Sequence, residues 1–447
     1  MMMERIAMRL AAKLPALLTA IGFCLSAQGF AVEKVVVMTS YPQEVVTQFE
    51  AAFEKRHPEY RLEILWRQSR DAMSYLQKPD HGVDVYWTPS RQNFAELRKQ
   101  GSLRKLDVDV SIDVSGVAES IGGYQLADPE HYYFATEIAG FGMAFNKAVL
   151  ENRQLAVPRN WADIAAPGFE GLVALPVPSK VGFAPSLVDT LLQGYGWTEG
   201  WSLLTRIAAN ARLVDSGSTF ITDEVASGRV AVGVTMDFFA ASAIAKGLEI
   251  EFTYPELVGY SPAHVAILQA SGNLEGARAF AAFTLSDEGQ KLLFHPDIRK
   301  LPVKPMVYRE KPQGYFDPFA AAERVSYAYD GELGRARQEL VSALFDAMIT
   351  RHHEALKRMW GTLRDAEQAA PGHPGLKEAF RLATTLPLDE RQANDPALHG
   401  IFSSRDADAK TRAEALEKQW DAQIGAQYAQ AEALARGILD NVGKSSP

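Results

Sequence analysis

The sequence predicts an α/β fold because short apolar segments of strand length alternate with amphipathic helical segments along most of the chain. Three such pairs fill residues 33–101, and a second series follows between residues 171 and 247. Strands that alternate with helices imply a parallel sheet with helices on both faces. Two long apolar stripes of helical spacing follow after residue 335. We therefore expect two α/β regions and an all-helical C-terminal part.

The first three strand–helix pairs are recognised because a continuous apolar run changes to apolar residues at helical spacing. A continuous apolar run precedes a segment in which Val45, Val46, Phe49 and Phe53 recur at helical spacing. Pro42 suits a first helical position, where the missing amide hydrogen is not needed. The predicted strands span residues 33–38, 60–66 and 83–88, and the predicted helices span residues 42–58, 69–77 and 90–101.

Each of these strands is followed by polar side chains, which include hydroxyl groups at all three junctions. In a parallel sheet, ligands bind beyond the carboxyl ends of the strands, against helix N-termini with orphan amides. The alternative is that each Ser or Thr only caps the next helix. Three such junctions in series, one with an arginine, favour binding. The junction residues are Thr39, Ser40, Tyr41, Arg67, Gln68, Ser69, Thr88 and Ser90.

The second α/β region repeats this arrangement at its own strand ends. Lys180, beside Ser179, is suited to an anionic ligand, whereas Asp237 is suited to a hydroxyl or an amine. A solvated loop charge is the commoner role of a lysine, and Asp237 is also a good N-cap. The polar residues after the middle strand of this region are Ser216, Gly217, Ser218 and Thr219.

Residues 1–31 have the pattern of a cleaved secretory signal, with basic residues, an apolar stretch and small residues in that order. The only cysteine, Cys24, lies in this segment, so the mature chain has no thiol for disulfides, catalysis or metal binding. No later apolar run is long enough to span a membrane. The net charge of −9 argues against a general nucleic-acid binder.

Three segments then resemble the extracellular solute-binding proteins of ABC importers. They are "VPRNWADIAAPGFEGLVALPVP" (157–178), "MAFNKAVL" (143–150) and "GARAFAAFTLSDEGQKLL" (276–293). The resemblance implies a type II periplasmic binding protein fold, with two doubly wound α/β lobes and crossover strands near residues 132–140 and 252–268. The expected parts are a signal peptide (1–31), a discontinuous first lobe (32–135 and 255–334), a second lobe (136–254) and a helical C-terminal extension (335–447).

Within this family the chain resembles the phosphoglycerate-sensing regulatory components, through "WRQS" (66–69), "GWTEGW" (196–201), "YSPAHVAIL" (260–268) and "LPVKP" (301–305). The resemblance implies ligand roles for Arg67, Ser69, Ser179, Lys180 and Asp237. It implies capture of a small anionic metabolite by a periplasmic monomer that has no cofactor and that presents the ligand to an ABC permease, a membrane sensor, or both. The full predicted ligand-binding set is Ser40, Tyr41, Arg67, Ser69, Ser90, Ser179, Lys180, Ser218, Thr219 and Asp237.

Two other functions compete with this prediction. Ferric-ion capture in the same superfamily uses neighbouring tyrosines, but the comparable position here carries Phe238 and Phe239, which have no oxygen. Amine-type ligands remain open because of Asp237, and phosphonates are a further alternative for the same fold. An exported hydrolase would use Asp237 or His264 in the same crevice, although the sequence contains no nucleophile elbow or metal-ligand spacing.

The C-terminal part is expected to contain two long helices, at residues 337–363 and 410–439, whose apolar stripes indicate burial on one face. A breaker at residues 369–375 and an irregular connection at residues 384–400 are expected between them. His352 and His353 are expected on a helix surface. The extension is either a helical cap on one lobe or a surface that docks a partner and reports lobe closure.

Overall fold

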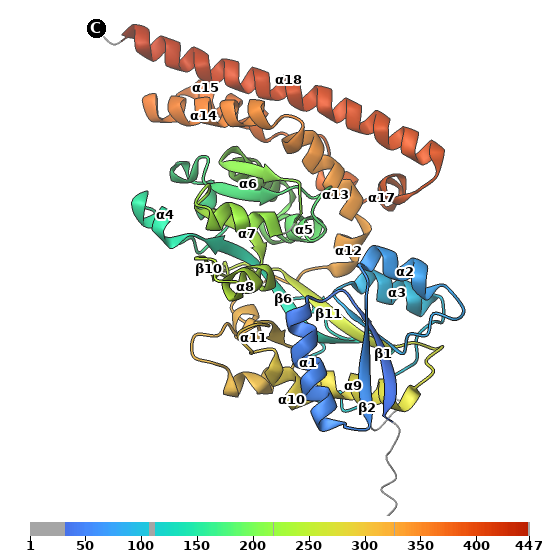
Figure 1. Cartoon of the computed structure of the whole chain (residues 1–447). Coiled ribbons are helices and arrows are strands. Elements are labelled where there is room, and N and C mark those ends of the chain that lie inside the picture. Colours follow the sequence, from blue (N-terminus) through green and yellow to red (C-terminus); the bar gives the residue numbers. More distant parts are fainter. Residues whose placement is uncertain (1–31, 107–111, 218, 326, 446–447) are drawn as a thin grey trace, which may run out of the picture.

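The computed structural model describes residues 32–106, 112–217, 219–325 and 327–445. The predicted signal peptide and Ser218 therefore lie outside the described residues. A ten-stranded sheet runs through the α/β part in the order β2-β1-β3-β11-β6-β9-β7-β8, and β10 and β12 pair with β6 (Figure 1). The C-terminal helices form a layer on the side of the molecule that is farthest from β1 and β2.

The first three strand–helix pairs are confirmed almost residue for residue. Strand β1 is parallel to β2 and β3, as the alternation predicted. Pro42 is the N-cap of α1 and not its first helical residue, so the helix begins one residue later than predicted. The elements are β1 (Glu33–Thr39), α1 (Gln43–Arg56), β2 (Tyr60–Trp66), α2 (Ser69–Leu76), β3 (Val85–Thr88) and α3 (Arg91–Lys99).

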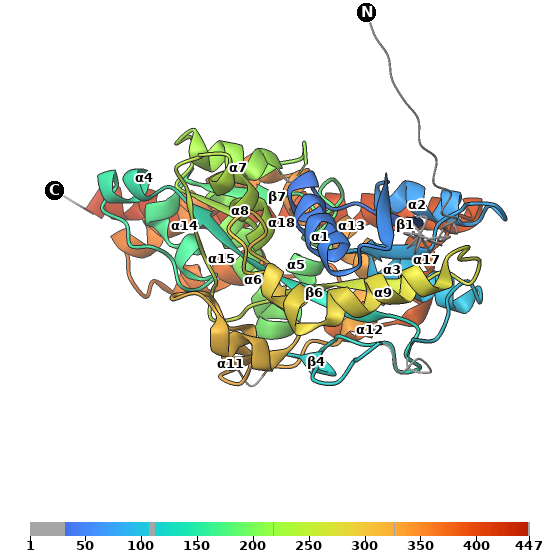
Figure 2. The ribbon, with the colours of Figure 1, turned by 60° about the horizontal axis from the view of Figure 1, so that its bottom comes forward.

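Helices cover both faces of this half of the sheet, because successive residues of β1 enter different cores. Val35 and Val37 pack with α1 and α9, whereas Met38 packs with α2 and α3. Figure 2 shows α1 and α9 on the same side of the sheet, where Phe53 contacts Phe280. We call β1–β3 and β11 (Tyr260–Ile267), with α1–α3, α9 (Leu274–Leu285) and α10 (Asp287–Leu292), the first lobe.

The second lobe repeats the parallel arrangement, with β7 parallel to both β8 and β9. Its helices α5 and α6 are largely buried, and Trp197 and Trp201 pack edge to face within its core. Its elements are α4 (Lys147–Asn152), β7 (Val173–Pro176), α5 (Ala184–Tyr195), α6 (Trp197–Ala209), β8 (Ala211–Val214), α7 (Thr219–Ala226), β9 (Val232–Met236) and α8 (Asp237–Ala245).

Strand β6 (Phe134–Phe145) belongs to both lobes and is buried along its whole length. Ala135 is level with His264 of β11, which pairs with Thr88 at the end of β3. Farther along β6, Phe141 pairs with Met236 at the end of β9. Six residues of strand span roughly 20 Å. The carboxyl ends of the parallel strands of both lobes therefore point toward the middle of β6.

The remaining elements before the extension complete the crossover region. Strand β12 pairs with Glu137 and Ile138 of β6, and β10 pairs with the far end of β6. Their bounds are β4 (Ser120–Ile121), β5 (Tyr124–Gln125), β10 (Glu251–Thr253), β12 (Leu301–Pro302) and α11 (Pro318–Ala322), with short 3-10 turns at Asp163–Ala165, Pro167–Phe169 and Pro305–Glu310.

The helical extension is confirmed, but its internal structure differs from the prediction. The expected helix at 337–363 is divided by a π-helical turn at Asp346–Thr350, and the expected irregular connection contains two capped helices. Helix α12 (Gly331–Ala336) leads into the extension, whose helices are α13 (Gln338–Phe345), α14 (His353–Ala369), α15 (Pro374–Thr384), α16 (Glu390–Ala393), α17 (Pro396–Ser403) and α18 (Ala407–Ser445).

The expectation that His352 and His353 are surface residues is wrong. The His353 Nε2 atom lies 2.8 Å from the Ala208 carbonyl oxygen of α6, and burial lowers the pKa of this imidazole. His352 lies 3.0 Å from the Asp421 carboxylate of α18. Both histidines thus join the extension to its neighbours. Among the described residues, none of the helices combines the length and hydropathy of a membrane span.

Candidate ligand-binding cleft

The three predicted junctions of the first lobe meet at one edge of the sheet. The Ser40 and Thr88 hydroxyl oxygens are 2.5 Å apart, which joins the ends of β1 and β3. The amide of Arg67 donates to the Thr39 carbonyl at 2.8 Å, which extends the ladder between β1 and β2 past the end of β2. Ser90 lies two residues after Thr88, and its amide donates to the Thr88 carbonyl at 3.0 Å. The structure therefore brings the hydroxyl groups of Ser40 and Thr88 and the Arg67 backbone to one edge.

The helices that begin at this edge have no side-chain caps. The N-cap residues of α1, α2 and α3 are Pro42, Gln68 and Ser90, and none of the three accepts a hydrogen bond from the first turn. The orphan amides at a helix N-terminus carry a partial positive charge and favour an anion. Ser90 thus occupies the predicted N-cap position of α3 but does not make the hydrogen bond of a cap, and the N-cap positions of α1 and α2 carry no Ser or Thr.

Arg67 lies beside these N-termini, and its side chain is only partly used by the protein. Its guanidinium carbon is 4.7 Å from the Tyr75 ring centroid, and its buried Nε atom has no hydrogen-bond partner. The neighbouring Trp66 is 54% exposed and donates from Nε1 to the Tyr41 carbonyl at 3.1 Å. The Ser69 side chain lies outside the part of the chain that the structure describes.

Tyr41 leads into a buried polar cluster that sequence reasoning missed. Its hydroxyl donates to Glu137 of β6, and the Lys300 ammonium lies 3.2 Å from the same carboxylate. Burial raises the pKa of Glu137, and the charge of Lys300 opposes that rise. Lys300 also lies 4.7 Å from the Tyr41 ring centroid and 4.6 Å from that of Phe238. This lysine thus contacts an aromatic ring from each lobe.

A sequence signal for this cluster existed but was weak. Glu137 is the only charged residue of the apolar strand β6, and Lys300 precedes the strand that pairs with it. Buried charges are almost always paired, so an acidic residue in such a strand predicts a basic partner. The partner is 163 residues away in sequence, and sequence pattern alone does not identify it.

Asp237 is buried at the start of α8, with its carboxylate already engaged by the protein. It accepts hydrogen bonds from the Gly140 amide at 2.7 Å, the Tyr254 hydroxyl at 2.9 Å and the Phe238 amide at 2.7 Å. Burial raises its pKa to about 6, against these hydrogen bonds and the charge of Lys300. Asp237 therefore ties α8 to the crossover strand, and it also lines a cavity of about 410 Å³ with Arg299.

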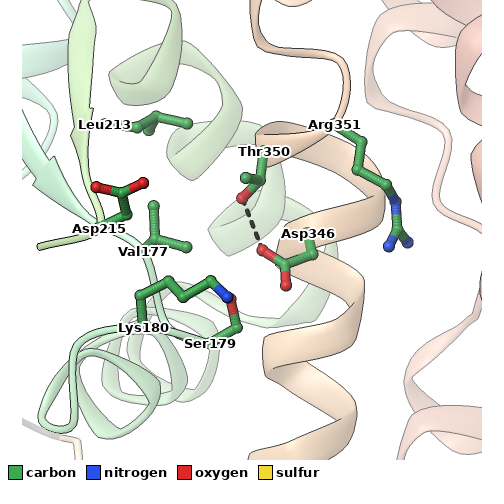
Figure 3. Close-up of a pocket in the computed structure, with 8 residues that line it drawn as sticks. All are labelled: Val177, Ser179, Lys180, Leu213, Asp215, Asp346, Thr350 and Arg351. Atoms are coloured by element: carbon green, nitrogen blue, oxygen red, sulfur yellow. Dashed lines mark hydrogen bonds between the residues drawn. The ribbon is translucent and has the colours of Figure 1, made fainter.

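Ser179 and Lys180 lie at the end of β7, but the opposite wall of their pocket comes from the extension. The pocket holds about 200 Å³, and Figure 3 shows Lys180 on one side and Asp346 and Thr350 of the π-helical turn on the other. None of the described residues of the first lobe lines this pocket. Thr219 is exposed at the start of α7. The predicted residues of the two lobes thus form separate groups in the described structure.

The residues proposed for metal binding or hydrolysis have the following surroundings in the described structure. Among the described residues, His, Cys, Asp and Glu side chains form no group of three suited to a metal ion. His264 is buried between the rings of Phe94 and Tyr133, at centroid distances of 5.5 and 5.2 Å. It therefore packs within the first lobe and does not face a crevice.

Two α/β lobes share the crossover strand β6, and the carboxyl ends of their parallel strands point toward its middle, an arrangement suited to binding a small solute. Residues 88–314 match the family described as bacterial extracellular solute-binding protein. The match covers more than half of the chain, so the chain belongs to this family. The description of this family names binding proteins and not enzymes.

The relatives and solved structures extend this assignment. The phosphoglycerate transport regulatory protein PgtC of Salmonella typhimurium is 29% identical over 338 residues, which cover 76% of this chain and 80% of PgtC. The periplasmic binding protein AfuA from Actinobacillus pleuropneumoniae, solved with fructose-6-phosphate, has a TM-score of 0.56 and 18% identity, covering 70% of this chain and 98% of AfuA. Iron-bound HitA from Pseudomonas aeruginosa has a TM-score of 0.51 and 18% identity, covering 65% and 92%. These structures confirm the predicted fold.

Proposed function

We propose that the chain captures a small anionic metabolite, phosphorylated or carboxylated, in the cleft between its two lobes. The observation that carries this proposal is the set of three adjacent helix N-termini without side-chain caps, at the edge where Arg67 lies. Orphan amides and a guanidinium group are complementary to a phosphate or carboxylate. Each charge-assisted hydrogen bond would contribute about 1.5–3 kcal/mol.

Ligand binding would favour a closed arrangement of the lobes. A ligand that contacts both lobes only when they close shifts the population toward that state by its differential affinity. We place the first lobe at residues 32–135 and 255–334, the second lobe at 136–254 and the extension at 335–447. The β6 strand and the segment that leads into β11 would then be the crossovers that bend.

The relatives support a phosphate-bearing ligand. PgtC is a phosphoglycerate transport regulatory protein, and the AfuA structure contains fructose-6-phosphate. We therefore infer a three-carbon or sugar phosphate as the ligand class, a periplasmic location after removal of residues 1–31, and a monomer without turnover. The partner would be an ABC permease, the periplasmic domain of a membrane sensor kinase, or both.

Thermal unfolding in the presence of candidate ligands tests this proposal. The panel contains 3-phosphoglycerate, phosphoenolpyruvate, fructose-6-phosphate, a phosphonate, spermidine and ferric citrate. A true ligand at about 100 times its Kd stabilises the folded state by about 2.7 kcal/mol. We expect stabilisation by a phosphorylated compound, which is recovered unchanged. Stabilisation by spermidine or ferric citrate alone, or turnover of the phosphorylated compound, would refute the proposed ligand class.

A further inference from the structure

The helical extension and the second lobe share one hydrophobic core. Phe141, Trp201 and Leu204 of the second lobe belong to the same buried cluster as Leu356, Trp360 and other residues of the extension. Helix α14 packs on α6, and α13 packs on α5. In Figure 1, α14, α15 and α18 lie as a layer over α6. Within the described residues, no residue after Tyr329 belongs to the apolar clusters of the first lobe or the crossover region.

A buried ion pair fixes the base of the extension to α5. The Arg337 Nε atom donates to Asp189 Oδ1 at 2.6 Å, and the two side chains are 2% and 1% exposed. The same guanidinium donates to Asn394 at 2.7 Å and lies 5.1 Å from the Trp197 ring centroid. Because the geometry of a guanidinium fork is planar and rigid, one arginine holds α5, α6 and the α16 end together.

A second set of contacts joins the far end of α14 to the second lobe. Arg364 donates to Asn210 at 2.8 Å and to Glu170 at 3.0 Å. His353, which lies between Arg337 and Arg364 in the sequence, contacts the Ala208 carbonyl. The extension is therefore attached along the length of α6 and not at a single point, which opposes rotation of one part against the other.

The chain enters the extension through a close contact with the crossover region. The Tyr329 amide donates to the Gly122 carbonyl at 2.8 Å, and the Tyr329 ring stacks on Tyr124 at 4.3 Å. Tyr124 in turn lies 2.8 Å from the Thr190 hydroxyl of α5. A Cβ atom at Gly334 would lie 1.9 Å from the Tyr329 hydroxyl and 2.6 Å from Asp189 Oδ2, so a larger residue there would displace these two buried side chains. The passage between the lobes is thus tightly packed at the point where the extension begins.

We propose that the extension is a lever arm rigidly attached to the second lobe, so that lobe closure moves its far end relative to the first lobe. This inference depends on closure as described under the proposed function. Helix α18 has 39 residues and is therefore about 58 Å long. A lobe rotation of roughly 20° would displace the end of such an arm by roughly 20 Å. A small change at the ligand thus becomes a large change at a surface that a partner can contact.

Distances between pairs of spin labels test the lever. Cys24 is the only cysteine, so a mature chain takes labels only at introduced sites. Exposed positions are Lys55 in α1, Lys246 after α8 and Asp440 in α18. With saturating 3-phosphoglycerate, we expect the Lys55–Lys246 and Lys55–Asp440 distances to change together. The Lys246–Asp440 distance should stay within about 2 Å of its ligand-free value, since both positions belong to one rigid body.

Two outcomes would overturn the lever: a Lys246–Asp440 distance that changes with the other two, or a Lys55–Asp440 distance that stays fixed while the lobes close. If no distance changes with any ligand of the panel, the proposed ligand class fails. The rigid attachment of the extension is then still tested in the ligand-free protein, because a rigid arm gives a narrow distribution of Lys246–Asp440 distances. A broad distribution in the wild type would exclude it. The variant Arg337→Met should broaden the distribution, whereas Arg335→Met, which removes an exposed ion pair with Glu332, should not.

Discussion

Two regions of the molecule differ in whether their polar groups have hydrogen-bond partners. One is the contact between the second lobe and the extension, and the other is the set of strand ends in the first lobe. In the contact, Asp189, Arg337 and Asn394 satisfy one another in the interior, and α16 and α17 begin with side-chain caps. At the strand ends, α1–α3 begin without side-chain caps, and the Arg67 Nε atom has no partner. Satisfied groups stabilise one arrangement, whereas unsatisfied groups leave binding capacity for a ligand. The first region is therefore built for rigidity and the second for recognition.

The largest expected effect comes from breaking the rigid contact. Arg337→Met leaves Asp189 buried without its cationic partner, which should lower the free energy of unfolding by about 3–5 kcal/mol. Urea denaturation measures this loss. The double variant Arg337→Met with Asp189→Leu should recover part of it, because no unpaired charge remains. Equal losses in the single and double variants would show that the ion pair itself is unimportant.

The second-largest expected effect is a pH dependence of stability that comes from Asp237, which joins α8 to the crossover strand β6. The pKa of this carboxyl in the folded protein is about 6, above its ordinary value of 3.8, so the folded state binds a proton that the unfolded state has released. The folded protein should therefore lose stability as the pH rises from 4 to 7, by roughly 3 kcal/mol from this group. Asp237→Asn should remove this component, which denaturation of both proteins at pH 4, 5, 6 and 7 measures. Parallel curves for the two proteins would contradict the pKa.

Removal of the Arg67 guanidinium tests recognition directly. Arg67→Met should weaken binding of the phosphorylated ligand by about 10–100-fold, the loss of one charge-assisted interaction. Its unfolding free energy should change little, because the Nε atom makes no hydrogen bond in the structure. Isothermal titration calorimetry and thermal unfolding separate the two effects. Unchanged affinity would remove Arg67 from the site. The matched control is Arg61→Met, which replaces an exposed arginine of β2, the strand that precedes Arg67.

The smallest effect distinguishes two serines that both occupy N-cap positions in the first lobe. The Ser286 hydroxyl accepts from the Gly289 amide at 3.1 Å and caps α10, whereas Ser90 precedes α3 without such a bond. Ser286→Ala should therefore cost about 1 kcal/mol of stability. Ser90→Ala should cost less than about 0.5 kcal/mol but weaken ligand binding. Equal destabilisation by the two substitutions would show that Ser90 is an ordinary cap.

Hydrophobic period was sufficient to predict the elements of the first lobe. Val35, Val37 and Phe49 lie in the core as the alternation indicated, and the carboxyl ends of β1–β3 share an edge because parallel strands must. In the extension, the helices at residues 390–403 were missed although Asp389 and Asp395 were available as caps. Their apolar segments were too short for helical periodicity to show.

Long-range contacts account for the rest of what sequence reasoning missed. The pairing of Lys300 with Glu137, and that of Arg337 with Asp189, each join residues more than 140 positions apart. The position of Lys180 could not be predicted either, because the π-helical turn that faces it belongs to a different part of the chain. The roles of Ser40, Tyr41, Arg67, Ser90, Ser179, Lys180 and Thr219 in binding stay predictions.

The shared core has a practical consequence for truncation experiments. Deleting the extension would expose the faces of α5 and α6 that now contact α13 and α14, and would leave Asp189 without Arg337. Large apolar surfaces released in this way promote aggregation. A shortened chain that fails in transport or signalling would therefore report misfolding and not a lost docking surface. Substitutions on the solvent side of α18, such as Gln419 or Gln430, isolate partner contact while the fold stays intact.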